Sequence, residues 1–404
     1  MSSKRSVTLI IISRYEPGTA GGLERVVRVQ IDAASNTDSN FIIAYRGRNC
    51  SNKPLRYISK NSEKRATVVC IPDYTNNVVF GDLILSPLIY FLTLLRFKPD
   101  VIMDNLDFTV ICKFLSFILH RKAIIIKVHH GTPLYLKSYS ESGIRGTLAR
   151  LYETILSFII KLSYKMVDHH IAVSDKVLEE LVQFYSFRKD KVIVINNAVD
   201  ITTYSPRPKD MARVMFDIPV DDKVVLFVGR DLIRKGFLIA YKVAKELRNE
   251  INNLTFLIVT SSNSMKIIAR ILKEELLRDW IRILTDVPND KMPYVYNSAD
   301  VLLLPSKYEG APLTFLEALA SGLPVIASPY AAPKTYDGFG YIIAHTVEQY
   351  IEKTRRLLTD SKFWFDMSFK ARRLAIEKFD IRYQLLAYKV FIESILNSTK
   401  DGGA

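Results

Sequence analysis

Two glutamates stand at a spacing that suits recognition of a sugar and a ribose, in the segment YEGAPLTFLEALASGLPVIAS. Glu309 follows the apolar run DVLLLPS, which predicts a buried strand, and Glu317 comes about two helical turns further along the chain. A carboxylate at a strand end accepts hydrogen bonds from sugar hydroxyls, and one on the next helix accepts them from a ribose diol. The alternative is that Glu309 lies in a solvated loop and Glu317 closes a helical turn.

A second segment, LFVGRDLIRKGF, brings cations to a turn between a predicted strand and a predicted helix. Arg230 and Lys235, flanked by Gly229 and Gly236, are suited to neutralise a diphosphate whose charge grows as a glycosidic bond breaks. Arg234 is a candidate helper. The alternative is a solvated turn whose cations face only water.

Glycines at two further turns let the backbone approach a ligand closely. Gly310 precedes a helix that begins after Pro312, and the start of that helix offers unpaired N–H groups to phosphate. Gly21 and Gly22 follow the first predicted strand, so the N–H groups of their turn would face the same end of a sheet. The dinucleotide fingerprint GxGxxG is absent, and a plain tight turn is the alternative at this position.

Histidines end another predicted strand, IIIKVHHG, at His129 and His130. An imidazole at that end would contact a transferred sugar or a leaving phosphate, and a hydrogen-bonded structural histidine is the alternative. His169 and His170 precede the run IAVS and are interpreted as structural. Because His130 has no HxxH or HxH partner, we predict no metal site.

Short β-branched runs alternate with helical patterns along the chain, which predicts α/β domains with parallel sheets covered by helices on both faces. The pattern breaks where prolines cluster and apolar periodicity fades, so we predict a linker at residues 201–222. A first domain then spans 1–200, a second 223–380, and a C-terminal helix with a tail 381–404. Two doubly wound domains facing across a cleft would place a site at the carboxyl ends of their strands.

The segment at residues 308–328 resembles the donor-sugar signature of the retaining glycosyltransferases of family 4, also called glycosyl transferases group 1. That family has the GT-B fold of two Rossmann-like domains, so the resemblance implies this architecture. In the family a Gly-Arg and a Lys-Gly pair hold the nucleotide diphosphate, and both pairs stand in this chain. The sequence departs from the family's pattern at Ala311, Pro312, Ala332 and Lys334, and Pro312 lacks an N–H group for phosphate.

The resemblance also assigns roles to weaker candidates. The family's GGxE opening matches Gly21, Gly22 and Glu24, which implies that Glu24 and Arg25 lie on the acceptor side of the first domain. The family commonly has a His-Gly pair at the end of the strand IIIKVHHG. The resemblance therefore implies that the second histidine, His130, is the functional one. The C-terminal helix of the family crosses back to pack on the first domain.

The implied reaction is transfer of a sugar from a nucleotide diphosphate sugar to an acceptor hydroxyl with retention of configuration. Glu309, His130, Arg230 and Lys235 would be catalytic, with the departing diphosphate helping to deprotonate the acceptor. No cofactor is expected, and the two cations would replace Mg²⁺ because no Asp-x-Asp stands at a matching site. The alternatives are a sugar-nucleotide epimerase or phosphorylase of the same fold, and a non-catalytic sugar-nucleotide-binding protein.

The composition of the chain excludes several other classes of protein. A chain of 404 residues that is 49% hydrophobic and 24% charged is too large for a peptide and too apolar for a disordered protein. The net charge of +14 favours anionic partners, but no RNP, helix-turn-helix or zinc-finger pattern points to nucleic acid. Three cysteines without CxxC spacing predict neither a disulfide framework nor a zinc site, and favour a reducing compartment.

Apolar stretches beside cations suggest a membrane surface as a further partner. The run SPLIYFLTLLRFK includes Arg96 and Lys98, and a predicted helix at 144–165 has cations beside an apolar stripe. Such faces lie on anionic membranes, and family members often use lipid-linked acceptors; burial of both helices in the core is the alternative. No apolar run reaches the roughly 20 residues of a membrane span, so we expect a cytoplasmic protein, peripheral at the inner membrane face, with a glycan or lipid-linked acceptor.

Overall fold

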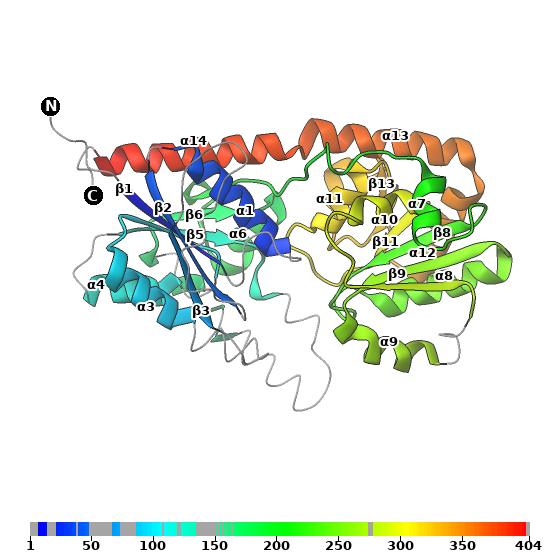
Figure 1. Ribbon diagram of the computed structural model, residues 1–404, viewed down its shortest axis with the longest axis horizontal. Coiled ribbons are helices and arrows are strands. Elements are labelled where there is room, and N and C mark those ends of the chain that lie inside the picture. Colours follow the sequence, from blue (N-terminus) through cyan, green and yellow to red (C-terminus); the bar gives the residue numbers. More distant parts are fainter. Residues whose placement is uncertain are drawn as a thin grey trace. The chain divides into compact units, whose positions relative to one another are not determined.

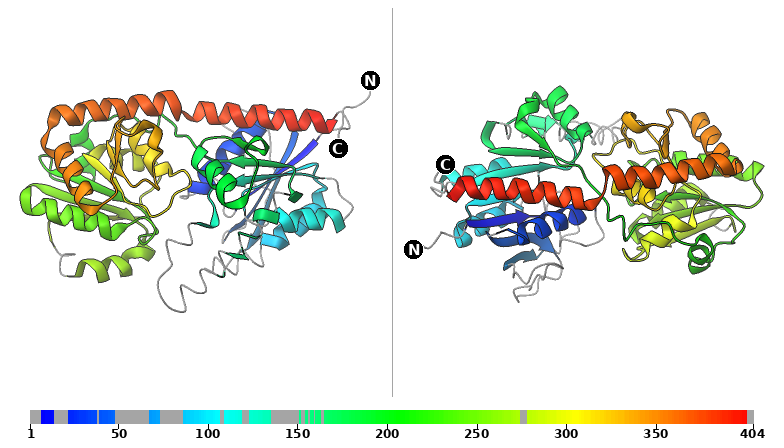
Figure 2. Two further views of the ribbon diagram at one scale, coloured as in Figure 1. Left: turned by 180° about the vertical axis from the view of Figure 1, so that it is seen from behind. Right: turned by 90° about the horizontal axis from the view of Figure 1, so that it is seen from above.

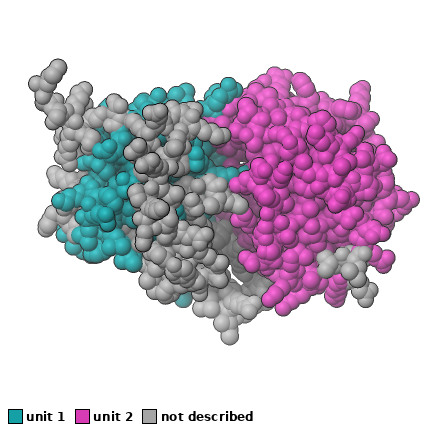
Figure 3. Space-filling model, in the orientation of Figure 1, with its two compact units in different colours: residues 1–133, 151–197, 382–404 teal, residues 134–150, 198–381 magenta. Residues whose placement is uncertain are grey.

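The computed structural model describes most of the chain, in two compact units that Figure 3 shows in different colours. Residues 1–133, 151–197 and 382–404 belong to unit 1, and residues 134–150 and 198–381 belong to unit 2. The described residues are 7–13, 22–37, 39–47, 67–72, 86–106, 109–118, 123–134, 151, 154–155, 157–158, 160–162, 165–273 and 278–400.

Unit 1 contains a seven-stranded parallel sheet in the order β3-β2-β1-β4-β5-β6-β7 (Figure 1). The strands consist largely of Val, Ile and other apolar residues because helices cover both faces of a parallel sheet. The strands are β1 (Val7–Ile12), β2 (Ser39–Gly47), β3 (Thr67–Pro72), β4 (Val101–Asp104), β5 (Ile124–His129), β6 (His169–Ala172) and β7 (Val192–Val194).

The helices of unit 1 include the last helix of the chain. Gln30 of α1 donates a hydrogen bond from Nε2 to Tyr388 Oη of α14 at 3.2 Å, and Figures 1 and 2 show the two helices side by side. The C-terminal helix therefore packs within unit 1, although unit 2 precedes it in sequence. The described helices are α1 (Gly22–Ser35), α3 (Ser86–Phe97), α4 (Thr109–Ile118), α6 (Asp175–Tyr185) and α14 (Ile381–Lys400).

Unit 2 contains a six-stranded parallel sheet in the order β10-β9-β8-β11-β12-β13. Buried side chains form one apolar cluster around Tyr296 and Tyr341 and another around Phe237 and Phe256. The strands are β8 (Lys223–Val228), β9 (Leu254–Thr260), β10 (Ile281–Thr285), β11 (Val301–Leu304), β12 (Val325–Ala327) and β13 (Tyr341–Ile343). The helices are α7 (Lys209–Met215), α8 (Phe237–Glu250), α9 (Met265–Leu272), α10 (Met292–Ser298), α11 (Leu313–Ala320), α12 (Val347–Thr359) and α13 (Ser361–Lys378).

Strand order confirms the predicted fold class of two doubly wound, Rossmann-like domains. In unit 1 the order reverses between β1 and β4, and in unit 2 between β8 and β11. In sheets of this type, ligands bind at the carboxyl ends of the two strands that flank the reversal. These four strand ends are therefore where functional side chains are expected.

The segment predicted as a linker, residues 201–222, belongs to unit 2 and contains helix α7. Arg213 of α7 is buried and donates to Asp300 Oδ2 at 2.8 Å, and the same oxygen accepts a bond from Val224 N at 2.7 Å. The segment is thus fixed to the start of β8. Its helix has only seven residues, which is too short for apolar periodicity to reveal it.

Cys70 of β3 is disulfide-bonded, which the cysteine spacing of the sequence does not predict. A disulfide requires that the fold bring two cysteine Cα atoms within about 4.4–6.8 Å of each other and that an oxidant be present. Three cysteines without a spacing motif give no information on that distance.

Replacing either of two glycines of unit 2 that have positive φ should lower the stability, and to different extents. Gly340 has φ +90°, and a Cβ there would overlap the backbone of Ala371, whereas Gly338 has φ +84° and open space around it. We expect Gly340→Ala to lower the free energy of unfolding by about 2–5 kcal/mol, because left-handed strain and overpacking add. Gly338→Ala should cost only the strain, about 1–2 kcal/mol.

Urea unfolding followed by tryptophan fluorescence measures this difference, because both tryptophans, Trp280 and Trp364, lie in unit 2. Equal losses in the two variants would show that contact with Ala371 has no influence on the free energy of unfolding.

Candidate active site

The candidate residues of unit 2 gather where the central strands β8 and β11 end. Gly229 and Arg230 directly follow β8, and Glu309 lies in the loop that leads from β11 to α11. Lys235 lies just before α8, which follows β8. The sequence-predicted segments therefore meet at the reversal of strand order, the usual ligand position in such a sheet.

Glu309 is held between two cations. Its Oε1 lies 2.7 Å from Lys235 Nζ, and its Oε2 lies 3.1 Å from Arg234 Nη1. Burial acts to raise the pKa of Glu309, but the charges of Lys235 and Arg234 outweigh it, so the pKa lies below its ordinary value. The carboxyl group is therefore ionised at neutral pH and acts as a hydrogen-bond acceptor.

Gly229 and Gly236 leave the space that this ion pair needs. A Cβ at Gly229 would come within 2.8 Å of Lys235 Cγ and displace the lysine side chain. Gly236 begins α8 with φ +72°, and a Cβ there would overlap the carbonyl group of Pro305 beyond β11. Both positions thus have a packing reason to be glycine, independent of any ligand.

Arg234, a candidate helper in the sequence, joins the two loops. Its Nε donates to Asp231 Oδ2 at 3.1 Å, and its Nη1 donates to the carbonyl oxygen of Tyr308 at 2.9 Å. Its own carbonyl oxygen accepts a bond from Lys307 N at 2.7 Å. The turn after β8 and the loop after β11 are therefore fixed to one another through this residue.

Arg230 is exposed, and the structure does not bring it into the Glu309 cluster. Its carbonyl oxygen accepts a hydrogen bond from Ser264 Oγ at 2.8 Å. Hydrogen bonds from Ser262, with a smaller contribution from the charge of Arg230, lower the pKa of Asp286. The backbone at Arg230 is thus anchored while its guanidinium group faces solvent.

Glu317 lies on α11 with only 2% of its surface exposed. The hydroxyl of Tyr296 donates to its Oε2 at 2.6 Å, a contact that the spacing of the two glutamates does not reveal. Helix α11 follows Gly310 and has Pro312 at its N-cap, with no side chain capping its first turn. The N–H groups of that turn remain suited to an anion.

His130 of unit 1 is oriented by a chain of buried amides. Its Nε2 lies 2.8 Å from Oδ1 of Asn105, which follows β4 and donates from Nδ2 to Ile12 O at 3.0 Å. The amide groups of Asn105 and Gln30 donate to one another at 2.9 Å, and Gln30 also reaches Tyr388. The sequence prediction missed Asn105 and Gln30, although Asn105 stands at a strand end.

His129, by contrast, belongs to the core of unit 1. Its Nε2 lies 3.1 Å from His170 Nδ1, and Phe187 packs edge-on against both rings. Burial, followed by the charge of Lys127, lowers the pKa of His129 well below its ordinary value. A neutral, packed imidazole of this kind has a structural role.

The glycine-rich opening is described only in part. Gly21 lies outside the described residues, and Gly22 is the first residue of α1. Glu24 is buried in the first turn of that helix, and Arg25 is half-buried. Across the described ranges, no group of three or more His, Cys, Asp or Glu side chains is placed to hold a metal ion.

Solved structures share this fold over nearly the whole chain. One is Anabaena HepE in complex with UDP and glucose, with a TM-score of 0.72 and 16% identity, covering 97% of this chain and 100% of that one. Another is sucrose-phosphate synthase from Thermosynechococcus elongatus, with a TM-score of 0.77 and 18% identity over the same shares. The protein is thus of the GT-B fold class.

Family comparisons then place the chain within this class. Residues 20–203 match Glycosyltransferase Family 4, and residues 209–374 match Glycosyl transferases group 1. The chain therefore belongs to the family 4 glycosyltransferases, as the donor-sugar signature predicts.

Curated relatives match over shorter stretches. D-inositol 3-phosphate glycosyltransferase of Thermobispora bispora is 27% identical over 214 residues, which are 48% of this chain and 49% of the relative. The protein of the same name from Corynebacterium glutamicum is 33% identical over 160 residues, or 37% and 38% of the two chains. The chain spans about half, or less, of the length of the curated relatives it matches.

The Glu309 cluster predicts a pH-dependent contribution to stability. Glu309→Gln should lower the free energy of unfolding at pH 7 by roughly 2–3 kcal/mol, because Lys235 and Arg234 lose a buried counter-charge. The folded-state pKa of Glu309 is lowered, so its stabilisation is complete above the pKa of an unfolded glutamate, about 4.3, and is lost as pH falls through the folded-state value. Urea titrations from pH 7 to pH 3 should show wild type and variant converging in acid.

The matched control is Glu250→Gln, which breaks an exposed bidentate pair with Arg355 in the same unit. Solvent screens that pair, so stability should change little at any pH. A gap between wild type and Glu309→Gln that stays constant to pH 3 would contradict the assigned ionisation.

Proposed function

We propose that this protein is a retaining glycosyltransferase that moves a sugar from a nucleotide diphosphate sugar to an acceptor hydroxyl. The observation that carries the proposal is the Lys235–Glu309–Arg234 cluster at the reversal of strand order in unit 2, with the exposed Arg230 on the same turn. Family membership, and the complex of the similar HepE with UDP and glucose, support this choice of donor class.

In the proposed mechanism, Glu309 accepts hydrogen bonds from hydroxyls of the transferred sugar, because its carboxylate is ionised and held in place. Glu317, positioned by Tyr296, receives the ribose diol, and the first turn of α11 together with Gly310 meets the phosphates. Arg230 and Lys235 neutralise the diphosphate. His130, oriented by its amide partner, contacts the sugar or the leaving phosphate.

The bond between the anomeric carbon and the phosphate oxygen breaks, and its electron pair leaves with the diphosphate. The acceptor oxygen bonds to the same face of the anomeric carbon, and its proton passes to the departing phosphate oxygen. Charge accumulates on the phosphate as the bond breaks, so Arg230 and Lys235 bind the transition state more tightly than the donor. These two cations supply the positive charge that a divalent metal would otherwise supply, and no cofactor takes part.

The donor reaction is tested with a panel of nucleotide sugars, by release of nucleoside diphosphate in the presence of chelator. Arg230→Ala and Lys235→Ala should each lower kcat about 10²–10³-fold, because each removes charge stabilisation from the transition state. The matched control is Lys223→Ala, since Lys223 is an exposed cation at the opposite end of β8. Its activity should equal that of wild type.

Other outcomes identify the alternatives. Donor binding without diphosphate release would indicate a non-catalytic binding protein, and conversion of donor without an acceptor would indicate an epimerase or phosphorylase. Activity abolished by chelator and restored by Mg²⁺ would overturn the metal-independent mechanism.

We further propose that the acceptor is a glycan or lipid-linked, and that the protein works in the cytoplasm at the inner membrane face. Helices α3 and α4 have large apolar side chains exposed to solvent, among them Leu92, Leu95, Phe114 and Phe117. Phe117 is 78% exposed. The cation Lys98 is also exposed just beyond α3. Apolar side chains beside cations suit an anionic membrane. None of the described helices has the length and hydropathy of a membrane span.

Flotation with vesicles tests the membrane proposal. Wild type should float with vesicles containing anionic lipid, less so at high salt, and Phe114→Ser with Phe117→Ser should reduce the bound fraction several-fold because apolar contact is lost. The control, Phe365→Ser with Phe369→Ser, removes two equally exposed phenylalanines from α13 of unit 2. Absence of salt-sensitive binding in wild type would reject the proposal.

A further inference from the structure

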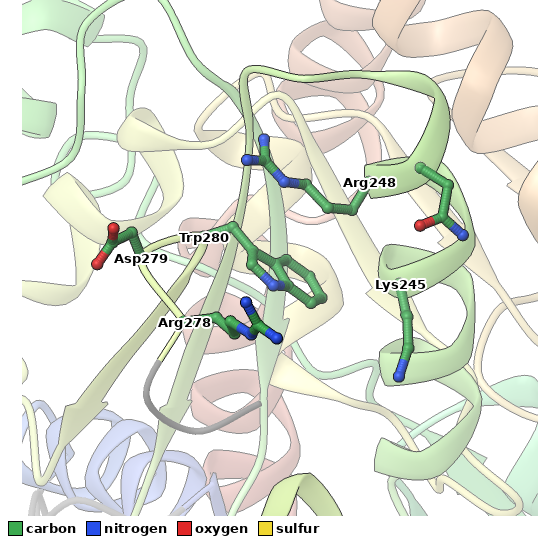
Figure 4. A pocket seen from close by; sticks show the side chains of 6 residues that line it. Lys245, Arg248, Arg278, Asp279 and Trp280 are labelled. Carbon is green, nitrogen blue, oxygen red and sulfur yellow. The ribbon is translucent and has the colours of Figure 1, made fainter. Parts of the chain in front are cut away.

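Unit 2 contains a pocket at the opposite end of α8 from Lys235. Its volume is about 330 Å³ (Figure 4). Helix α8 begins beside the Glu309 cluster and, at about 1.5 Å per residue, carries Arg248 roughly 17 Å away along its axis. The pocket is therefore separate from the residues assigned to the donor. Its lining residues are Lys245, Arg248, Asn249, Arg278, Asp279 and Trp280.

The floor of the pocket is held by the core. Trp280 is 9% exposed, and its ring stacks on Phe256, with centroids 6.5 Å apart and ring planes inclined by 26°. Phe256 stacks in turn on Phe237 at 6.3 Å, and its backbone N–H donates to Trp280 O at 2.7 Å. Arg278 is anchored by a bond from Ile281 N to its carbonyl oxygen. The lining groups thus project from a rigid frame.

Two arginines that line the pocket have no counter-charge among the described residues. Throughout the residues that the structure describes, the side chains of Arg248 and Arg278 form neither an ion pair nor a hydrogen bond. Glu250, close by on α8, is engaged in its bidentate pair with Arg355 at 2.6 Å. Figure 4 shows Arg248 and Arg278 on either side of the Trp280 indole and the carboxylate of Asp279 directed away from it.

A structural explanation accounts for only part of this arrangement. The carbonyl end of α8 favours a cation such as Arg248, which lies in its last turn. The carbonyl end of α8 does not explain Arg278, because this residue lies outside the helix, on the segment before β10. The two guanidinium groups repel one another, and a bound anion would relieve that repulsion.

We propose that this pocket binds a small soluble phosphate ester. The phosphate lies between the guanidinium groups of Arg248 and Arg278, whose planar forks match phosphate oxygens. The organic part of the ligand lies against the exposed part of the Trp280 indole. The pocket volume suits a ligand the size of a phosphorylated monosaccharide.

The fluorescence of Trp280 tests the proposal directly. The chain has two tryptophans, so Trp364→Phe leaves Trp280 as the sole reporter. Glucose 6-phosphate, titrated with UDP present to occupy the donor site, should change this fluorescence saturably with a Kd of about 1 mM or tighter. Arg248→Ala with Arg278→Ala should weaken binding at least about 10-fold, because two charge-assisted contacts are lost. Calorimetry on the unmodified chain should give the same Kd.

The matched control is Lys242→Ala with Lys266→Ala, which removes the same charge from exposed positions on α8 and α9 outside the pocket. Its affinity should equal that of wild type. Glucose should not bind, and inorganic phosphate should bind more weakly than the ester. No saturation by about 10 mM, or equal weakening in the control, would overturn the proposal. Because binding is measured without turnover, this result is independent of the proposed transferase activity.

Discussion

The buried ion pair between Lys235 and Glu309 determines how the loops at the centre of unit 2 can pack. A carboxylate this deeply buried is costly to desolvate, so it requires cations and hydrogen bonds at close range. Meeting that requirement brings the turn after β8 against the loop after β11, and the contact leaves no room for a side chain at Gly229 or Gly236. Arg234 then closes the arrangement by bonding to both loops. The glycines and cations of this segment therefore act as one steric and electrostatic unit.

Unit 1 places neutral amides beside an imidazole at its strand ends, next to the buried ion pair of Lys127 and Asp104. Where β4 and β5 end, His130 contacts the amide of Asn105, and that amide exchanges hydrogen bonds with Gln30. Neutral amides carry a smaller desolvation cost than charges, and they orient an imidazole by hydrogen bonding. The exposed Arg230 near the Glu309 cluster suits a diphosphate, and an imidazole held by an amide suits hydroxyl groups, as the proposed transfer requires.

The sequence predicts the features that depend on local pattern. Alternating runs predict both parallel sheets, and the positions of Lys235 and Glu309 after strands predict that they lie at one sheet edge. Contacts between distant segments are not visible in this way: Tyr296 reaches Glu317 from another helix, and Gln30 meets Tyr388 from the far end of the chain. The sequence predicts a linker in place of α7 for a related reason, since seven residues carry too little periodicity. Most of the predicted helix at 144–165 and Gly21 lie outside the described residues.

The contacts of unit 2 show where part of the net charge of +14 lies and which cations have a counter-charge. Several cations of unit 2 have a structural counter-charge, as Arg213 has in Asp300 and Arg355 has in Glu250. Arg248 and Arg278 instead lie together in a concave site, although a net positive chain can disperse its excess over an open surface. Clustering raises their mutual repulsion, which a bound anion would relieve. Excess charge placed in this way favours binding of a specific anion over general solubility.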